Sequence, residues 1–111
     1  MNHQLEKMFV FVSQATPKEG HVGDYLRIGI ASQQAAEGQP GLLQHQVLKP
    51  KEGNGPITLV STWESEDDFK AWIKTEAFKK VHGSDVMQQV QAWTTDLTVL
   101  GCDVAAAWQV E

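Results

Sequence analysis

The spacing of apolar residues between positions 65 and 82 constrains the fold more than any other feature of this chain. Phe69, Trp72 and Ile73 follow the i, i+3, i+4 spacing of a helix that packs one face on a core. At 3.6 residues per turn, Phe78 would lie on the opposite side of the same helix. A single straight helix is therefore excluded for this segment.

A second helix that starts after Thr75 accounts for the position of Phe78, because threonine is a favoured N-cap. Phe78, Val81 and His82 then form an i, i+3, i+4 stripe of their own. Ser65 and the acidic run after it form the start of the first helix. The sequence predicts two short helices, 66–74 and 76–82, that meet at a bend near Thr75. His82 is expected on the inward face of the second helix, at its C-terminal end.

The remaining elements follow from apolar patterning and turn residues. Strands are predicted at 7–15, 42–49, 57–63 and 96–110, a helix at 23–37, and one short helical turn within 84–93. The cluster 16–20 is expected to end the first strand, and a bulge or interruption is expected near Gly101. The order β-α-β-β-α-β predicts a ferredoxin-like α+β fold with an antiparallel sheet and helices on one face.

The sheet face without helices is expected to need a cover. Met8–Val12, for example, is an uninterrupted β-prone run with apolar residues for both faces. We expect one domain over residues 1–111, and a domain of this size buries only about two-thirds of its unfolded surface. A large exposed apolar face usually marks an interaction site. The sequence therefore predicts a homodimer.

Composition excludes several classes of partner. The net charge is −5 with neutral histidines, and no basic stripe is present, which argues against nucleic-acid binding. No apolar run approaches the ~18 residues of a membrane span. The single cysteine, Cys102, cannot form an intramolecular disulfide and is interpreted as a small strand residue. A cytoplasmic location is expected.

Trp63 and His82 stand out as candidates for chemistry. Taken singly, each is more typical of structure: a core aromatic at the end of a strand, and a histidine at a helix C-terminus. The other histidines share no metal-ligand spacing with His82, which disfavours a zinc or non-haem iron site; they are His3, His21 and His45. The other tryptophans are interpreted as packing residues: Trp72, Trp93 and Trp108.

A longer motif joins the two candidates. The chain has Trp63-Glu64-Ser65 at the end of a strand, then Phe69 and Trp72 in a Phe-x-x-Trp pattern, a small hydroxyl residue at Thr75, Phe78, and His82 four positions later. Over the 26 residues from 57 to 82, this pattern resembles that of the IsdG-type haem-degrading monooxygenases, in the antibiotic-biosynthesis monooxygenase superfamily. The order of elements extends a weaker similarity to the whole domain.

The resemblance implies a dimeric α/β barrel in which each subunit holds one haem between helices and sheet. It implies that His82 is the axial ligand of the haem iron, that Trp63 presses on the haem to distort it, and that O2 and an external electron donor are used. Counting back from Gly20, Ser13 stands where the family has an Asn that contacts the distal side of the haem, so this sequence departs from the family pattern at one of three functional positions. The expected apolar walls, besides Trp63, are Leu59, Phe69, Ile73 and Phe78.

Two other functions stay open for the same cavity. Some relatives oxidise quinols or polyketide-like aromatics without a cofactor. If this chain does the same, it needs no cofactor. Relatives of the quinol type usually carry His in place of Trp72, which disfavours that class. The second alternative is a non-catalytic member that binds its ligand without turnover. In each case the ligand is a tetrapyrrole or another small aromatic molecule.

Overall fold

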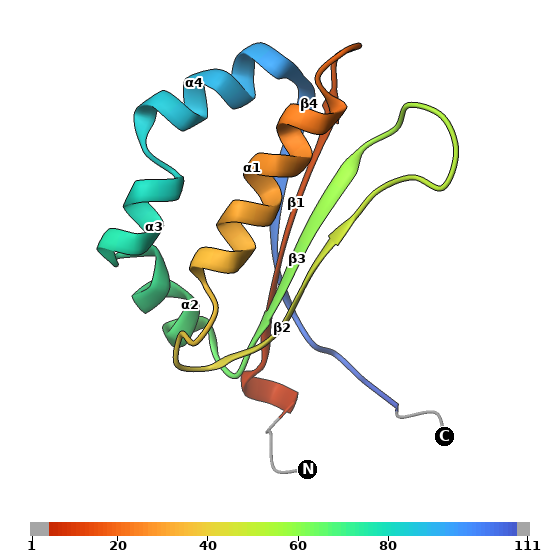
Figure 1. Ribbon diagram of the computed structural model, residues 1–111. Coiled ribbons are helices and arrows are strands. Elements are labelled where there is room, and N and C mark those ends of the chain that lie inside the picture. The colour runs from red at the N-terminus through yellow and green to blue at the C-terminus, as the bar shows by residue number, and fades with distance from the viewer. Residues whose placement is uncertain (1–4, 109–111) are drawn as a thin grey trace.

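The computed structural model describes residues 5–108, and its elements lie in the predicted order (Figure 1). They are η1 (Leu5–Lys7), β1 (Phe9–Pro17), α1 (Val22–Ala35), β2 (Leu42–Leu48), β3 (Ile57–Trp63), α2 (Glu66–Ile73), α3 (Glu76–Val81), α4 (Ser84–Trp93) and β4 (Thr94–Asp103). The strands pair in the order β2-β3-β1-β4, and every neighbouring pair is antiparallel. The ferredoxin-like α+β prediction is confirmed.

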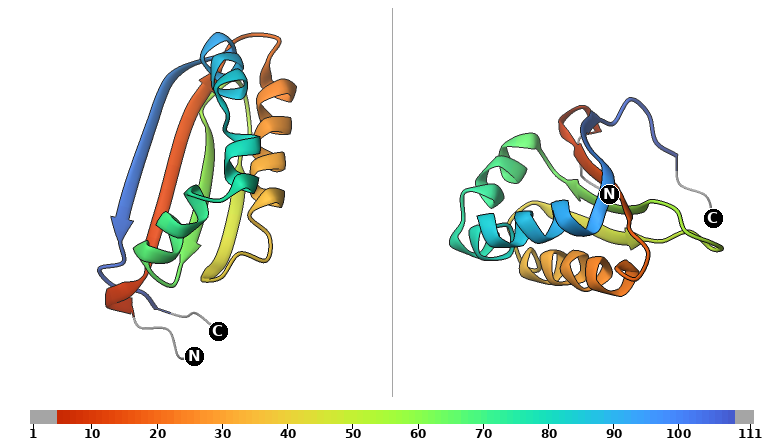
Figure 2. Two further views of the ribbon diagram at one scale, coloured as in Figure 1. Left: turned by 90° about the vertical axis from the view of Figure 1, so that its left-hand side faces the viewer. Right: turned by 90° about the horizontal axis from the view of Figure 1, so that it is seen from above.

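The helices form a layer on one face of the sheet (Figure 2). Strand alternation turns Phe9 and Ala15 of β1, with Ile57 and Trp63 of β3, towards these helices, and all four are buried. Phe9 and Trp63 belong to one core cluster and Ala15 and Ile57 to another, so the core has two centres along the sheet. None of the helices in residues 5–108 is long and apolar enough to cross a membrane.

The predicted break at Thr75 is confirmed to within a residue. The Thr75 hydroxyl accepts a hydrogen bond from the backbone N–H of Phe78 at 3.1 Å and donates one to the carbonyl of Trp72 at 2.8 Å. It therefore caps α3 and contacts the last turn of α2 at the same time. His82 follows α3 directly as its C-cap residue.

The contact between β1 and β4 differs from the prediction. β1 continues through Pro17, which pairs with Thr94, so β4 begins two residues early and ends at Asp103; residues 104–108 are not strand, and 109–110 lie outside the described part. The irregularity falls between Gln14 and Thr16, opposite the stretch where Asp96 has a φ of 56°, and not at Gly101. Gly101 pairs regularly, and a Cβ there would lie 2.8 Å from the ring of Phe9.

One helix and one tryptophan also depart from expectation. α4 has ten residues instead of one turn, because the stripe of Val86 and Val90 packs against the core although Gly83 supplies no capping side chain. In α1, Gly29 allows close contact, since a Cβ there would lie 3.0 Å from Leu59. Trp108, expected to pack, is 84% exposed.

The sheet face away from the helices, here called the open face, carries an apolar patch. By strand alternation it contains Val10 and Val12 of β1, with Val60 of β3 and Leu100 of β4 as direct partners of Val12. Leu100 is 61% exposed. Val10, Val12 and Val60 are partly exposed, and the helices lie on the other face of the sheet.

The cap at Thr75 can be tested by substitution. We expect Thr75→Ala to lower the free energy of unfolding by ~1 kcal/mol, because the N–H of Phe78 and the start of α3 lose their cap. Urea unfolding followed by circular dichroism measures the change. Ser84→Ala is the control, because Ser84 begins α4 without capping it. Equal effects of the two substitutions would contradict the role of Thr75.

Candidate functional site

Two adjoining cavities lie between the helix layer and the sheet. The larger one has a volume of about 300 Å³ and an almost wholly apolar lining from α1, α3, α4, β1, β3 and β4. The smaller one, of about 70 Å³, has a more polar lining that includes Ser13, Ser32, Gln33 and Ser61. His82 lines both cavities, together with Phe11, Ser13, Ser32, Leu59 and Phe78. The imidazole therefore lies where the two spaces meet.

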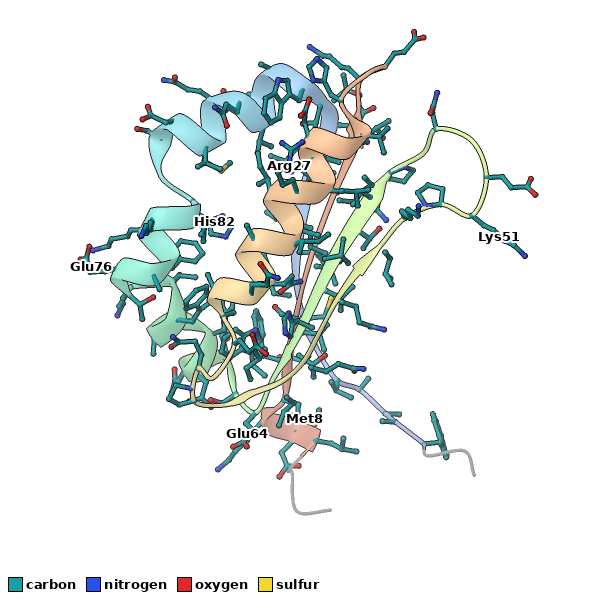
Figure 3. The ribbon with its side chains drawn as sticks, in the orientation of Figure 1. Met8, Arg27, Lys51, Glu64, Glu76 and His82 are labelled. Carbon is teal, nitrogen blue, oxygen red and sulfur yellow. The ribbon has the colours of Figure 1, made fainter. Side chains whose placement is uncertain are left out.

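The end of α3 holds His82 in place. Its side chain projects from α3 towards α1 (Figure 3), where Nε2 lies 2.7 Å from the hydroxyl oxygen of Ser32. The imidazole also stacks on the ring of Phe78, with centroids 4.3 Å apart and planes 19° apart. Burial lowers the pKa of His82 below its usual 6.5. The ring is thus neutral at pH 7 and has a lone pair for a metal or a hydrogen bond.

Besides His82, four of the expected wall and site residues line a cavity. Ser13, Leu59 and Phe78 line both cavities, and Phe69 lines the smaller one. Ile73 is not among the lining residues and packs instead against the core cluster of Phe9 and Trp63.

Trp63 also lies beside the cavities and not in their lining. Its side chain is 1% exposed, and its Nε1–H donates to the hydroxyl of Ser61 at 2.9 Å. The indole meets the ring of Phe69 edge-on, with centroids 5.8 Å apart. Ser61 and Phe69 line the smaller cavity, so Trp63 lies directly behind residues of its wall. In the described structure Trp63 is part of the core beside the cavity, and its expected contact with a ligand stays a prediction.

Trp72, which the sequence pattern predicts to be a packing residue, is the tryptophan that lines the smaller cavity. Its indole packs edge-on against Phe78 at 5.5 Å, across the bend between α2 and α3. The bend turns Phe69 and Trp72 of the first predicted stripe towards Phe78 and His82 of the second. The two stripes together therefore indicate that Trp72 lies at the cavity, which neither stripe indicates alone.

Two polar residues of α1 that the apolar pattern does not single out, Ser32 and Gln33, also line the smaller cavity. Ser32 lies on the same helix face as Tyr25, Gly29 and Ala36, all of which are buried. Gln33 beside it accepts a hydrogen bond from Nδ1 of His45 at 3.0 Å and donates to the carbonyl of Gln46 at 3.2 Å. A serine on an otherwise apolar stripe was the available signal for Ser32.

The described lining of the cavities holds no multidentate metal site of His, Cys, Asp or Glu side chains. Within residues 5–108, no group of three or more His, Cys, Asp or Glu side chains could hold a metal ion. His82 is the only one of these residue types in the described lining, and no Lys or Arg lines either cavity there. Tyr25 lines the larger cavity, and burial raises the pKa of its phenol, which keeps it protonated.

Fold and sequence together define the family. The sheet order, the single helix layer and the cavity between them are those of a ferredoxin-like α+β domain with a cavity under its helices. The sequence model of the family described as antibiotic biosynthesis monooxygenase matches residues 8–84. Since this is more than half of the chain, the protein belongs to the antibiotic biosynthesis monooxygenase family.

Curated relatives match only part of the chain. A mycobilin-producing heme oxygenase of Mycobacterium tuberculosis is 40% identical over 43 residues, which are 39% of this chain and 41% of that protein. A heme-degrading monooxygenase of Shouchella clausii is 43% identical over 49 residues, 41% of this chain and 45% of that protein. The chain thus matches less than half the length of these relatives.

Solved structures match nearly the whole chain. A variant of SnoaB, a cofactor-independent oxygenase from Streptomyces nogalater, aligns with a TM-score of 0.74 and 14% identity over 91% of this chain and 96% of that one. A MhuD variant with two manganese protoporphyrin IX molecules bound per active site aligns with a TM-score of 0.70 and 24% identity, over 92% of this chain and 99% of that one. At these identities the likeness establishes the fold alone.

Proposed function

We propose that this chain binds haem beside His82 and degrades it oxidatively with O2 and an external electron donor. The observation that carries the proposal is a neutral imidazole in the wall of an apolar cavity. The partial matches to heme oxygenases of other organisms support haem as the substrate. The general monooxygenase assignment rests on the family.

The described residues fit a haem group in three respects. His82 would offer one neutral imidazole nitrogen to the iron, and it is the only His, Cys, Asp or Glu side chain in the described lining of the larger cavity, which Tyr25 and Met87 also line. The volume of about 300 Å³ is at the lower end for small-molecule sites, but the cavity opens along β4, where Leu97 and Val99 are 43% and 62% exposed. The absence of Lys and Arg from the described lining favours ligand carboxylates that reach solvent.

Haem would supply the redox centre that binds and reduces O2, and the protein would position it and exclude water. His82 would hold the iron from the end of α3, and Leu59, Phe69 and Phe78 would form apolar walls. Ser13, which stands where the family has Asn, would provide a hydroxyl on the sheet side. We assign the indole that contacts the ligand to Trp72, because Trp63 lies behind Ser61 and Phe69.

Axial ligation is tested by haemin titration. We expect wild-type protein to give a Soret shift, and His82→Ala to lose it while keeping its fold, because the substitution is at a helix end. His45→Ala is the matched control, since His45 is also partly buried but lines neither cavity. A Soret shift unchanged by His82→Ala would refute the ligand assignment. Oxygen uptake with a quinol panel by haem-free protein would support the cofactor-independent alternative instead.

Turnover distinguishes the two tryptophans. With haemin, a reductant and O2, we expect the Soret band of wild type to decay. Trp72→Phe is expected to slow this decay by about tenfold or more, and Trp63→Phe to change the decay rate by less than about threefold. The reason is that only Trp72 lines a cavity. A larger effect of Trp63→Phe would restore the original assignment of that residue. Stable binding of haem without decay would indicate the non-catalytic alternative.

We also propose that the chain forms a homodimer through the open face, in a cytoplasmic setting suited to its free Cys102. The apolar patch around Val12 and Leu100 would be covered by the same patch of a second copy. Leu100→Glu is expected to give a monomer in light scattering, and Ile30→Glu, at an exposed apolar residue of α1, to leave the dimer intact. A wild-type monomer would contradict this proposal.

A further inference from the structure

A hydrogen bond joins the helix layer across the cavity, between Ser32 of α1 and His82 at the end of α3. The hydroxyl oxygen and Nε2 lie 2.7 Å apart, although the residues are 50 positions apart in sequence. It is the only hydrogen bond of the His82 ring, and the only one of the Ser32 hydroxyl, within the described residues. Both side chains line both cavities.

The direction of this bond depends on the tautomer of the His82 ring. A serine hydroxyl has one hydrogen to donate, and Nε2 is the one hydrogen-bond partner of the Ser32 hydroxyl in the described chain. A neutral imidazole has one lone pair, on the nitrogen that carries no hydrogen. If the hydroxyl donates to Nε2, its hydrogen is used and the ring proton lies on Nδ1. The lone pair of Nε2 is then occupied by a protein group before any ligand arrives.

We propose that Ser32 is a positioning residue that caps the Nε2 lone pair of His82, so that a metal binds Nε2 only by displacing this hydroxyl. The inference rests on the proposed function as far as that metal is haem iron. The cap fixes the ring tautomer and, with the stacked Phe78, the orientation of the ring. It also weakens binding of any ligand at Nε2, because the ligand has to replace a hydrogen bond that already exists.

The expected size of the effect is that of one neutral hydrogen bond. Losing the competing hydroxyl would tighten ligation of haemin by about fivefold. Ser32→Ala is a suitable variant, because Ser32 lies among buried small and apolar residues of α1 and Ala fits the helix. Ser32→Thr restores a hydroxyl and is the conservative counterpart.

The first measurement needs no haem. Nitrogen NMR of protein labelled with ¹⁵N-histidine reports which ring nitrogen carries the proton. We expect His82 of the wild type and of Ser32→Thr to be protonated on Nδ1, and Ser32→Ala to shift towards protonation on Nε2. Ser61→Ala is the matched control for the tautomer, because Ser61 lines the smaller cavity but bonds to Trp63. A wild-type ring protonated on Nε2, or no change in Ser32→Ala, would overturn the proposal.

The second measurement is haemin affinity from the Soret shift. Ser32→Ala is expected to bind about fivefold more tightly than wild type, with Ser32→Thr close to wild type. Weaker binding by Ser32→Ala would mean that the hydroxyl supports ligation, and would also overturn the proposal. If His82 ligates haemin in no variant, the proposed function fails, and the tautomer alone decides whether Ser32 caps Nε2.

Discussion

The hydroxyl of Thr75 is the contact on which the geometry of the site depends. It bonds to the last turn of α2 and the first turn of α3, so one helix ends and another begins within two residues. The change in direction turns Phe78 and His82 towards the sheet, where a straight helix would carry Phe78 to the opposite side of the stripe. It also brings Trp72 of α2 edge-on against Phe78 of α3. A single short polar side chain thus decides which residues reach the cavity.

The features that sequence predicts well are those set by neighbours a few residues apart. The bend at Thr75 and the inward position of His82 follow from a cap and a periodicity, and both are confirmed in the structure. The details of β4 depend instead on its pairing with β1, which is about 90 residues away in the chain. Gly101 was interpreted as an interruption, but its lack of a side chain makes room for the ring of Phe9. No local pattern contains that information.

The lining of the cavities was harder to predict than the elements around them. Periodicity identifies which side chains point inward, but it does not distinguish those that fill the core from those that border a void. Trp63 and Ile73 are inward and fill the core, whereas Trp72 and Ser32 border the smaller cavity. Ser32 could have been found, because a polar residue among Tyr25, Gly29 and Ala36 on one helix face requires a partner. The partner proved to be His82.

The uncharged character of the described lining limits the chemistry that the cavity can perform by itself. Acyl transfer would require a base oriented by a third group, but the His82 ring has no hydrogen bond in the described residues other than that to Ser32. Phosphoryl transfer would require cations, and no Lys or Arg lines the described cavities. Oxidation therefore has to draw on a bound cofactor or on an electron-rich substrate. These two cases make opposite demands on the imidazole, because a metal needs it as a ligand and a reactive substrate does not. Dependence on His82, more than the fold, separates the two kinds of monooxygenase.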